Sequence, residues 1–425
     1  MRSRFIQLLV ILSCASTISV AQSPSPSQQA EPSIQSLLDR IDRLEKRVNE
    51  LEERERKEAA GATNISERAA DESKPAQVVA PAAPMQHGEH VASATEVRET
   101  ETRYPSLQFR GFGDVDFSGT DQKGSSSGFT LGQFVLHVAS PLSPKVSYFG
   151  EVSFTARPTG YDLTVERTII RYDYNDFFKL SFGKYHTPIG YWNAAFHHGA
   201  WLQTTISRPE MVQIGGTFIP VHFVGLEAEG SIPSGGLGLG YHVGLGNGRS
   251  SLLSTAGDAG DSNNNRAWVA SLSARPTRFY GLEVGGSAYR DKVSPQTGGN
   301  FGEWITSAYV AWTKEKPEIL SEFANVHHQD VQTLQTFNSQ AFYVQVAYRF
   351  GWQENKWKPY YRFERIHRPV ADRVFANVLD LVGSTAGVRY DITNYAAFKA
   401  EYRNTQRGLN GPHVNGAFFQ TAFTF

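Results

Sequence analysis

From Tyr104 to the end of the chain, segments of about ten residues alternate large apolar residues with polar or small ones. Residues 342–350 are the clearest case, because aromatic and β-branched residues at even positions are separated by Gln345 and Arg349 at odd ones. A period of two is typical of a strand whose two faces meet different surroundings. An all-β body is therefore predicted. About sixteen such segments fit this part of the chain, beginning at about residues 106, 128, 146, 161, 178, 219, 237, 265, 280, 302, 318, 338, 357, 379, 395 and 415.

The connections between these segments differ in length. Every second connection is short: 140–145, 175–176, 233–236, 276–278, 314–317, 351–356 and 392–394. Most of those between are longer: 121–128, 187–218, 248–264, 291–300, 328–337, 367–377 and 406–413. Short turns at one end and long loops at the other are typical of a transmembrane antiparallel β-barrel in an outer membrane. An even strand count would put both ends of the barrel on the periplasmic side.

The last segment ends in aromatic residues at alternate positions, including Phe423 and the terminal Phe425. This ending resembles the one that the barrel-assembly machinery recognises in outer-membrane proteins, so both residues are candidate assembly signals. The alternative is a soluble β-domain whose last strand happens to end in Phe. The alternation of loop lengths together with this ending favours the membrane barrel.

The first residues have the pattern of a secretory signal peptide. Arg2 and Arg4 precede an apolar run over 5–12, and small residues permit cleavage after Ala21. A buried amino-terminal helix and lipidation of Cys14 are the alternatives. Cys14 is the only cysteine, so cleavage would leave a mature chain without a thiol, which suits export through an oxidising compartment. No other stretch is apolar for long enough to predict a transmembrane helix.

Residues 34–54 carry the heptad pattern of a short coiled coil. Basic residues at g and acidic residues at e would attract between parallel neighbours. β-Branched residues at the a positions with leucine at the d positions favour a dimer. An Arg-apolar-x-x-apolar-Glu spacing, however, resembles short trimeric coiled coils. A trimer is therefore preferred, and a dimer remains the alternative. A lone amphipathic helix is the other alternative. The core positions are Ile34, Leu37, Ile41, Leu44, Val48 and Leu51.

The predicted domain order follows from these patterns. Residues 55–103 are rich in Ala, Glu, Pro and Ser and lack periodicity, which is typical of a flexible linker. The order is a signal peptide at 1–21, a leader at 22–33, a coiled coil at 34–54, a flexible linker at 55–103 and a barrel at 104–425.

The longest connection, at about 187–218, falls between the fifth and sixth segments and contains Tyr191, Trp192 and Trp201. A long loop without its own strands is usually functional. We expect it to fold into the barrel, bury its aromatic side chains on the wall and constrict the pore. The candidate constriction residues are Arg208, Glu210, His197 and His198.

Taken together, the signal peptide, the coiled coil, the sixteen-segment body and the long fifth-to-sixth loop resemble trimeric porins of Gram-negative bacteria. The segment Phe-Gly-Lys-Tyr-His-Thr-Pro at 182–188 and the coiled-coil start resemble most the phosphate-selective porin O and P family. The resemblance implies a homotrimer in outer-membrane lipid that passes small hydrophilic solutes by diffusion. It also implies a preference for anions such as phosphate, an arginine ladder along the pore, and neither catalysis nor a cofactor.

Strand alternation gives this chain's own candidates for the pore lining, and their charges are mixed. Without the first 103 residues, which hold 13 basic and 16 acidic residues, the body has 28 basic and 26 acidic residues. Such a balance argues against strong focusing of anions and against a nucleic-acid-binding protein. Each candidate could also be a solvated charge or a rim salt bridge. They are Arg110, Asp114, Asp116, Glu151, Lys179, Arg349, Arg362, Glu364, Arg389, Lys399, Glu401 and Arg403.

Other chemical motifs are weak. Adjacent histidines at 197–198 and 327–328 would point to opposite faces of a strand and lack further ligands at suitable spacing, so no metal site is predicted there. The Gly-x-Ser-x-Gly match at 124–128 lacks the strand and helix that a nucleophile elbow needs. Two alternatives to a channel are a structural anchor whose coiled coil grips peptidoglycan and a barrel hydrolase that uses a serine and a histidine.

Overall fold

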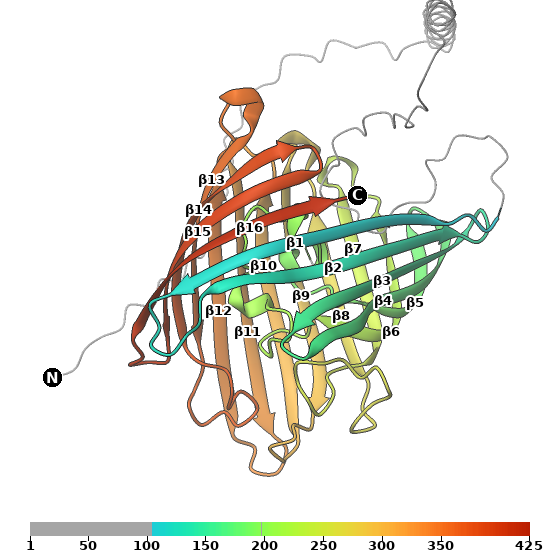
Figure 1. Cartoon of the computed structure of the whole chain (residues 1–425). Coiled ribbons are helices and arrows are strands. Elements are labelled where there is room, and N and C mark those ends of the chain that lie inside the picture. Colours follow the sequence, from blue (N-terminus) through green and yellow to red (C-terminus); the bar gives the residue numbers. More distant parts are fainter. Residues whose placement is uncertain (1–103, 197) are drawn as a thin grey trace, which may run out of the picture. The chain divides into compact units, whose positions relative to one another are not determined.

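The computed structural model describes residues 104–196 and 198–425, which form a closed β-barrel of sixteen antiparallel strands (Figure 1). Each strand pairs with its neighbours in sequence, and β1 pairs with β16 to close the ring. The predicted fold class is confirmed, and each strand begins within about three residues of its predicted start. The signal peptide, leader, coiled coil, linker and His197 lie outside the described residues.

The strands are β1 Gln108–Thr120, β2 Gly128–Pro141, β3 Val146–Arg157, β4 Gly160–Asn175, β5 Phe178–His186, β6 His222–Ile232, β7 Leu239–Asn247, β8 Ala267–Ala274, β9 Leu282–Val293, β10 Phe301–Trp312, β11 Glu318–Asp330, β12 Thr336–Ala347, β13 Trp357–His367, β14 Leu381–Thr393, β15 Ala396–Arg407 and β16 His413–Thr424. Helices are short. They are α2 Tyr191–Ala195 and the 3-10 turns η1 Ala200–Leu202, η2 Glu210–Val212, η3 Gly235–Leu237, η4 Thr277–Phe279 and η5 Gln353–Asn355. No helix in the described part of the chain is long and apolar enough to cross a membrane.

The alternation predicted from the sequence sorts side chains between the two faces of the barrel. On β7, Val243 and Leu245 are about half exposed on the outer face, while His242 and Gly244, which alternate with them, point inward. An apolar outer band beside a polar interior is the arrangement of a barrel that faces lipid. Ring closure also leaves no open sheet edge, so the ladder can satisfy the backbone polar groups of the strands without water.

The three longest connections, 187–221, 248–266 and 368–380, lie at one end of the barrel. The start of β1 and the end of β16 lie together at the other end, where Gly111 and Phe425 exchange two backbone hydrogen bonds of 2.8 and 3.0 Å. A Cβ atom at Gly111 would stand 2.3 Å from the ring of Phe425, so the ring occupies the space that a side chain would take. The aromatic carboxyl terminus is thus part of the closing seam.

Candidate functional site

The connection between β5 and β6, residues 187–221, folds into the barrel and is fastened to its wall. It carries α2, η1 and η2, which contact β10, β1 and β16, and β13 respectively. We call this segment the inner loop. That it constricts the pore, as the sequence predicts, stays a prediction.

The inner loop enters through a close contact with β11. Gly190 has a φ of 74°, and a Cβ atom there would stand 2.0 Å from Oε2 of Glu322. This space lets Glu322 accept hydrogen bonds from the backbone N–H groups of Tyr191 at 2.9 Å and Trp192 at 2.7 Å. The hydroxyl of Tyr343 donates to the same carboxylate. Glu322 therefore takes up N–H groups at the start of α2 that have no partner inside the helix.

Two more carboxylates bind inner-loop amides. Glu401 accepts from the backbone N–H groups of Ile206 at 2.5 Å and Ser207 at 3.3 Å. Glu364 accepts from the N–H of Glu210 at 2.6 Å. Charge-assisted bonds of this kind are stronger than neutral ones.

Basic side chains of β13, β14 and β15 bind the inner-loop carbonyls. Arg362 donates to the carbonyls of Ser207 at 2.8 Å and Arg208 at 3.1 Å. Lys399 donates to those of Ala200 at 2.6 Å and Thr205 at 3.0 Å. Arg362 and Lys399 are 1% and 0% exposed, so both charges are buried against the loop backbone.

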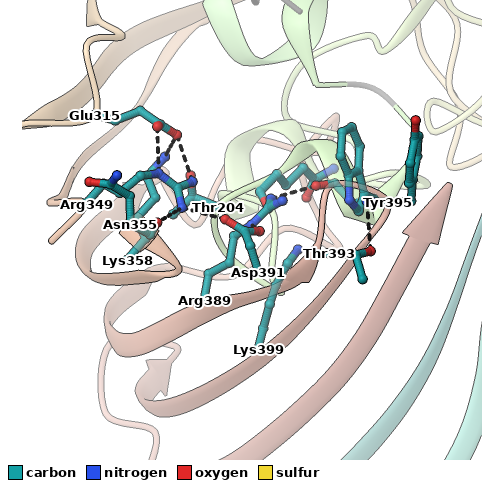
Figure 2. A network of polar contacts seen from close by, with 12 residues as sticks. Thr204, Glu315, Arg349, Asn355, Lys358, Arg389, Asp391, Thr393, Tyr395 and Lys399 are labelled. Atoms are coloured by element: carbon teal, nitrogen blue, oxygen red, sulfur yellow. Dashed lines mark hydrogen bonds and ion pairs between the residues drawn. The ribbon is translucent and has the colours of Figure 1, made fainter. Parts of the chain in front are cut away.

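Arg389 extends this set toward the short turns. It donates to the carbonyls of Trp201 at 2.6 Å and Gln203 at 2.9 Å, and its Nε binds Asp391 at 2.7 Å. Figure 2 shows the network continuing from Asp391 through Arg349 to Glu315. Arg349 lies in the connection after β12, so this candidate sits at the turn end of the barrel.

The side chain of Arg208 points back into the inner loop that carries it. It is 8% exposed and donates to the carbonyls of Val212 and Phe196, both at 2.9 Å. Burial lowers its pKa to about 10, although Glu166 and Glu322 act in the opposite direction, so it remains charged at neutral pH. Glu210 forms a two-pronged ion pair with Arg407 of β15 at 2.7 and 2.9 Å. Of these two candidates, Glu210 is the more exposed.

His198 and Ser207, which a hydrolase reading could combine, go to different walls. Nδ1 of His198 lies 3.0 Å from the amide oxygen of Gln133 on β2, and Nε2 lies 3.3 Å from Glu166 on β4. The hydroxyl of Ser207 binds Glu401 at 3.3 Å and receives a bond of 2.6 Å from Arg362. These are contacts that hold a loop in place.

The remaining pore-lining candidates have varied surroundings. Glu151 is buried in an ion pair with Arg167 at 2.5 Å. Arg403 binds Glu401 at 2.7 Å. Asp114 and Asp116 on β1 are half-buried, Arg110 at its start is exposed, and Lys179 on β5 is half-buried beside Glu229 of β6.

The inner face of β6–β9 differs from the wall that holds the loop. In register across β6 to β10 lie Glu229, His242, Ser271, Ser287 and Ser307, and the first four are partly exposed. Inward-facing side chains that remain partly exposed border open space in the lumen. We call the inner face of β6–β9 the open wall and that of β11–β15 the clamping wall.

Sequence reasoning missed the main residues of the open wall and one carboxylate of the clamping wall that binds the inner loop. Glu227, Glu229 and His242 escaped because alternation concerns one strand at a time, and pairing β6 with β7 across their short turn would have brought them together. Glu322 escaped because the path of the inner loop, which gives it a role, cannot be read from strand alternation.

Comparisons with solved structures give the same barrel at low sequence identity. The anion-selective porin from Comamonas acidovorans matches with a TM-score of 0.57 and 10% identity, over 76% of this chain and 100% of that one. The outer-membrane channel DcaP of Acinetobacter baumannii matches with a TM-score of 0.54 and 12% identity, over 76% and 98%. OmpT of Vibrio cholerae, an outer-membrane protein in trimer form, matches with a TM-score of 0.53 and 16% identity, over 76% and 100%. No protein-family model and no curated protein matches the chain. At these identities the likeness establishes the fold.

Proposed function

We propose that this protein is an outer-membrane porin that lets small hydrophilic solutes diffuse through its lumen. The observation that carries the proposal is an inner loop whose backbone is bound by buried charged side chains of the clamping wall, opposite an open wall of partly exposed polar side chains. A closed barrel with a narrowed, water-lined interior can select solutes by size and charge without chemistry. Barrels described as porins and channels share the fold, which supports the same role.

Selectivity for anions such as phosphate is the finer part of the proposal, taken from the resemblance to the porin O and P family. It would require basic side chains that solutes can reach. Arg275 in the turn before β9 is about half exposed. In contrast, Arg362, Arg389 and Lys399 form hydrogen bonds with inner-loop carbonyls. Glu229 and Glu283 also border the lumen, so we expect any anion preference to be weak.

Recording from purified protein in planar bilayers tests the proposal. We expect stable conductance, in steps of three if the protein is a homotrimer, and a reversal potential in asymmetric KCl that reports ion preference. A correctly folded barrel that never conducts would refute the porin and favour the structural anchor. Activity on lipid or peptide substrates would instead favour the hydrolase.

The assembly and export parts of the proposal lie beyond the barrel walls. We expect a cleaved signal peptide, a homotrimer aided by the coiled coil at 34–54, and recognition of Phe423 and Phe425 by the barrel-assembly machinery. Deleting 34–51 should lower the dissociation temperature of the trimer on native gels while the barrel still folds. An unchanged dissociation temperature would remove the coiled coil from this role.

A further inference from the structure

Three potential metal ligands meet on the open wall, from two neighbouring strands. Glu227 and Glu229 stand two residues apart on β6 and therefore share its inward face. His242 on β7 is the direct register partner of Glu229. One ligand atom from each of the three lies within 4.8 Å of the others.

The distances suit a small cation. Nδ1 of His242 lies 3.0 Å from a carboxylate oxygen of Glu227 and 3.4 Å from one of Glu229. Two ligands at about 2.1 Å from a tetrahedral metal stand about 3.4 Å apart. A single imidazole proton can satisfy one of the two carboxylates well, whereas a divalent cation between the three atoms would satisfy all of them.

A neighbouring arginine orients one of the carboxylates and leaves its second oxygen available to a metal. Nη1 of Arg171 lies 3.4 Å from Oε1 of Glu229, which leaves Oε2 facing His242. Arg171 also binds Asp173 at 2.9 Å, so its charge is shared. Partners of this kind fix the geometry of metal ligands. The His242 side chain is 40% exposed, so a hydrated ion can reach the group from the lumen.

We propose that Glu227, Glu229 and His242 form a binding site for a divalent transition-metal cation of the zinc class on the open wall. One imidazole nitrogen and two carboxylates match the donors that such ions take, and a fourth position stays open to water or a passing anion. Magnesium and calcium should bind more weakly because they prefer more oxygen ligands. The two carboxylates attract a divalent cation, and the bound ion would cancel their two negative charges.

Titration of the detergent-solubilised, folded protein with zinc chloride tests the site, using a purification tag without histidine. By calorimetry we expect saturable binding in the wild type that Glu229→Gln and His242→Ala each weaken about tenfold or more. His367→Ala is the matched control, since His367 is also an exposed histidine paired with a single carboxylate, Asp380, at 2.8 Å. Unheated gel mobility confirms that each variant barrel is folded.

Each outcome of the titration either supports or overturns the metal site. Losses in Glu229→Gln and His242→Ala with none in His367→Ala support the site. Equal affinities in all proteins, equal losses in all three variants, or wild-type binding weaker than about 1 mM overturn it. In bilayers, zinc should move the reversal potential of the wild type toward anions and leave His242→Ala unmoved. A barrel that binds zinc but never conducts would refute the porin and leave the metal site standing.

Discussion

The clamping wall and the open wall both carry charged or titratable side chains at the inward-facing positions of their strands, but these side chains differ in how deeply they are buried. Arg362 and Lys399 are almost completely buried against inner-loop carbonyls, while His242 across the barrel is 40% exposed. Burying a charge is costly unless hydrogen bonds replace its water. The inner loop supplies them, because its carbonyls and amides need partners as well.

A charged side chain that points inward is therefore not necessarily one that meets passing solutes. On the clamping wall, side chains of both signs act as backbone ligands, so their net effect on a passing ion is reduced. On the open wall, fewer charges remain, but solutes can approach them. We therefore expect stability to depend on the first wall and selectivity on the second.

The largest effect should come from removing a clamp. Arg362→Ala would leave Glu364 short of a partner and would remove one hydrogen-bond donor from each of two inner-loop carbonyls. Breaking a buried pair of this kind costs about 3–5 kcal/mol. We expect a lower unfolding temperature by circular dichroism in detergent, together with noisier and larger single-channel conductance. Arg365→Ala, at an exposed arginine of the same strand, should change neither.

A bulky residue on the open wall should block the path directly. Ser271→Trp places a large ring at a partly exposed inward position of β8, so we expect a clear fall in single-channel conductance with little loss of stability. Ser321→Trp is the control, because Ser321 faces outward on β11. Equal conductance in the two variants would mean that solutes do not pass along β6–β9.

Neutralising one carboxylate on each wall should have smaller effects, and these should differ between the two walls. Glu283→Gln, on the open wall beside Arg275 and Tyr309, should move the reversal potential toward anions. Glu401→Gln should instead lower the unfolding temperature, because it weakens the contacts to Ile206, Ser207 and Arg403. If Glu401→Gln shifts the reversal potential more than Glu283→Gln does, our assignment of the two walls is reversed.

The sequence predicted the barrel well because each strand repeats the same local rule. The starts of β2, β3, β5, β11 and β13 were predicted to the residue, and the inward faces of Arg362, Lys399 and Glu401 followed from alternation. What alternation cannot provide is the position of an inner loop that meets these side chains from far along the chain. Arg208 illustrates this limit, since its partners are carbonyls of its own loop. The roles predicted for all these residues in conduction stay predictions.

The smallest expected effect concerns the turn end of the clamping wall and depends on pH. Burial tends to raise the pKa of Glu315, but hydrogen bonds from Arg349 and Lys358 prevail and lower it from 4.5 to about 2. A carboxylate with a depressed folded-state pKa stabilises the barrel above its ordinary pKa, and this contribution is lost as the pH falls through the folded value. The unfolding temperature of Glu315→Gln should therefore lie below that of the wild type at pH 7, and the gap should shrink between about pH 4.5 and pH 2. Glu354→Gln, at an exposed carboxylate paired with Lys356, should show little gap at any pH. A gap for Glu315→Gln that stays constant to pH 2 would show that its ion pairs do not stabilise this end of the wall.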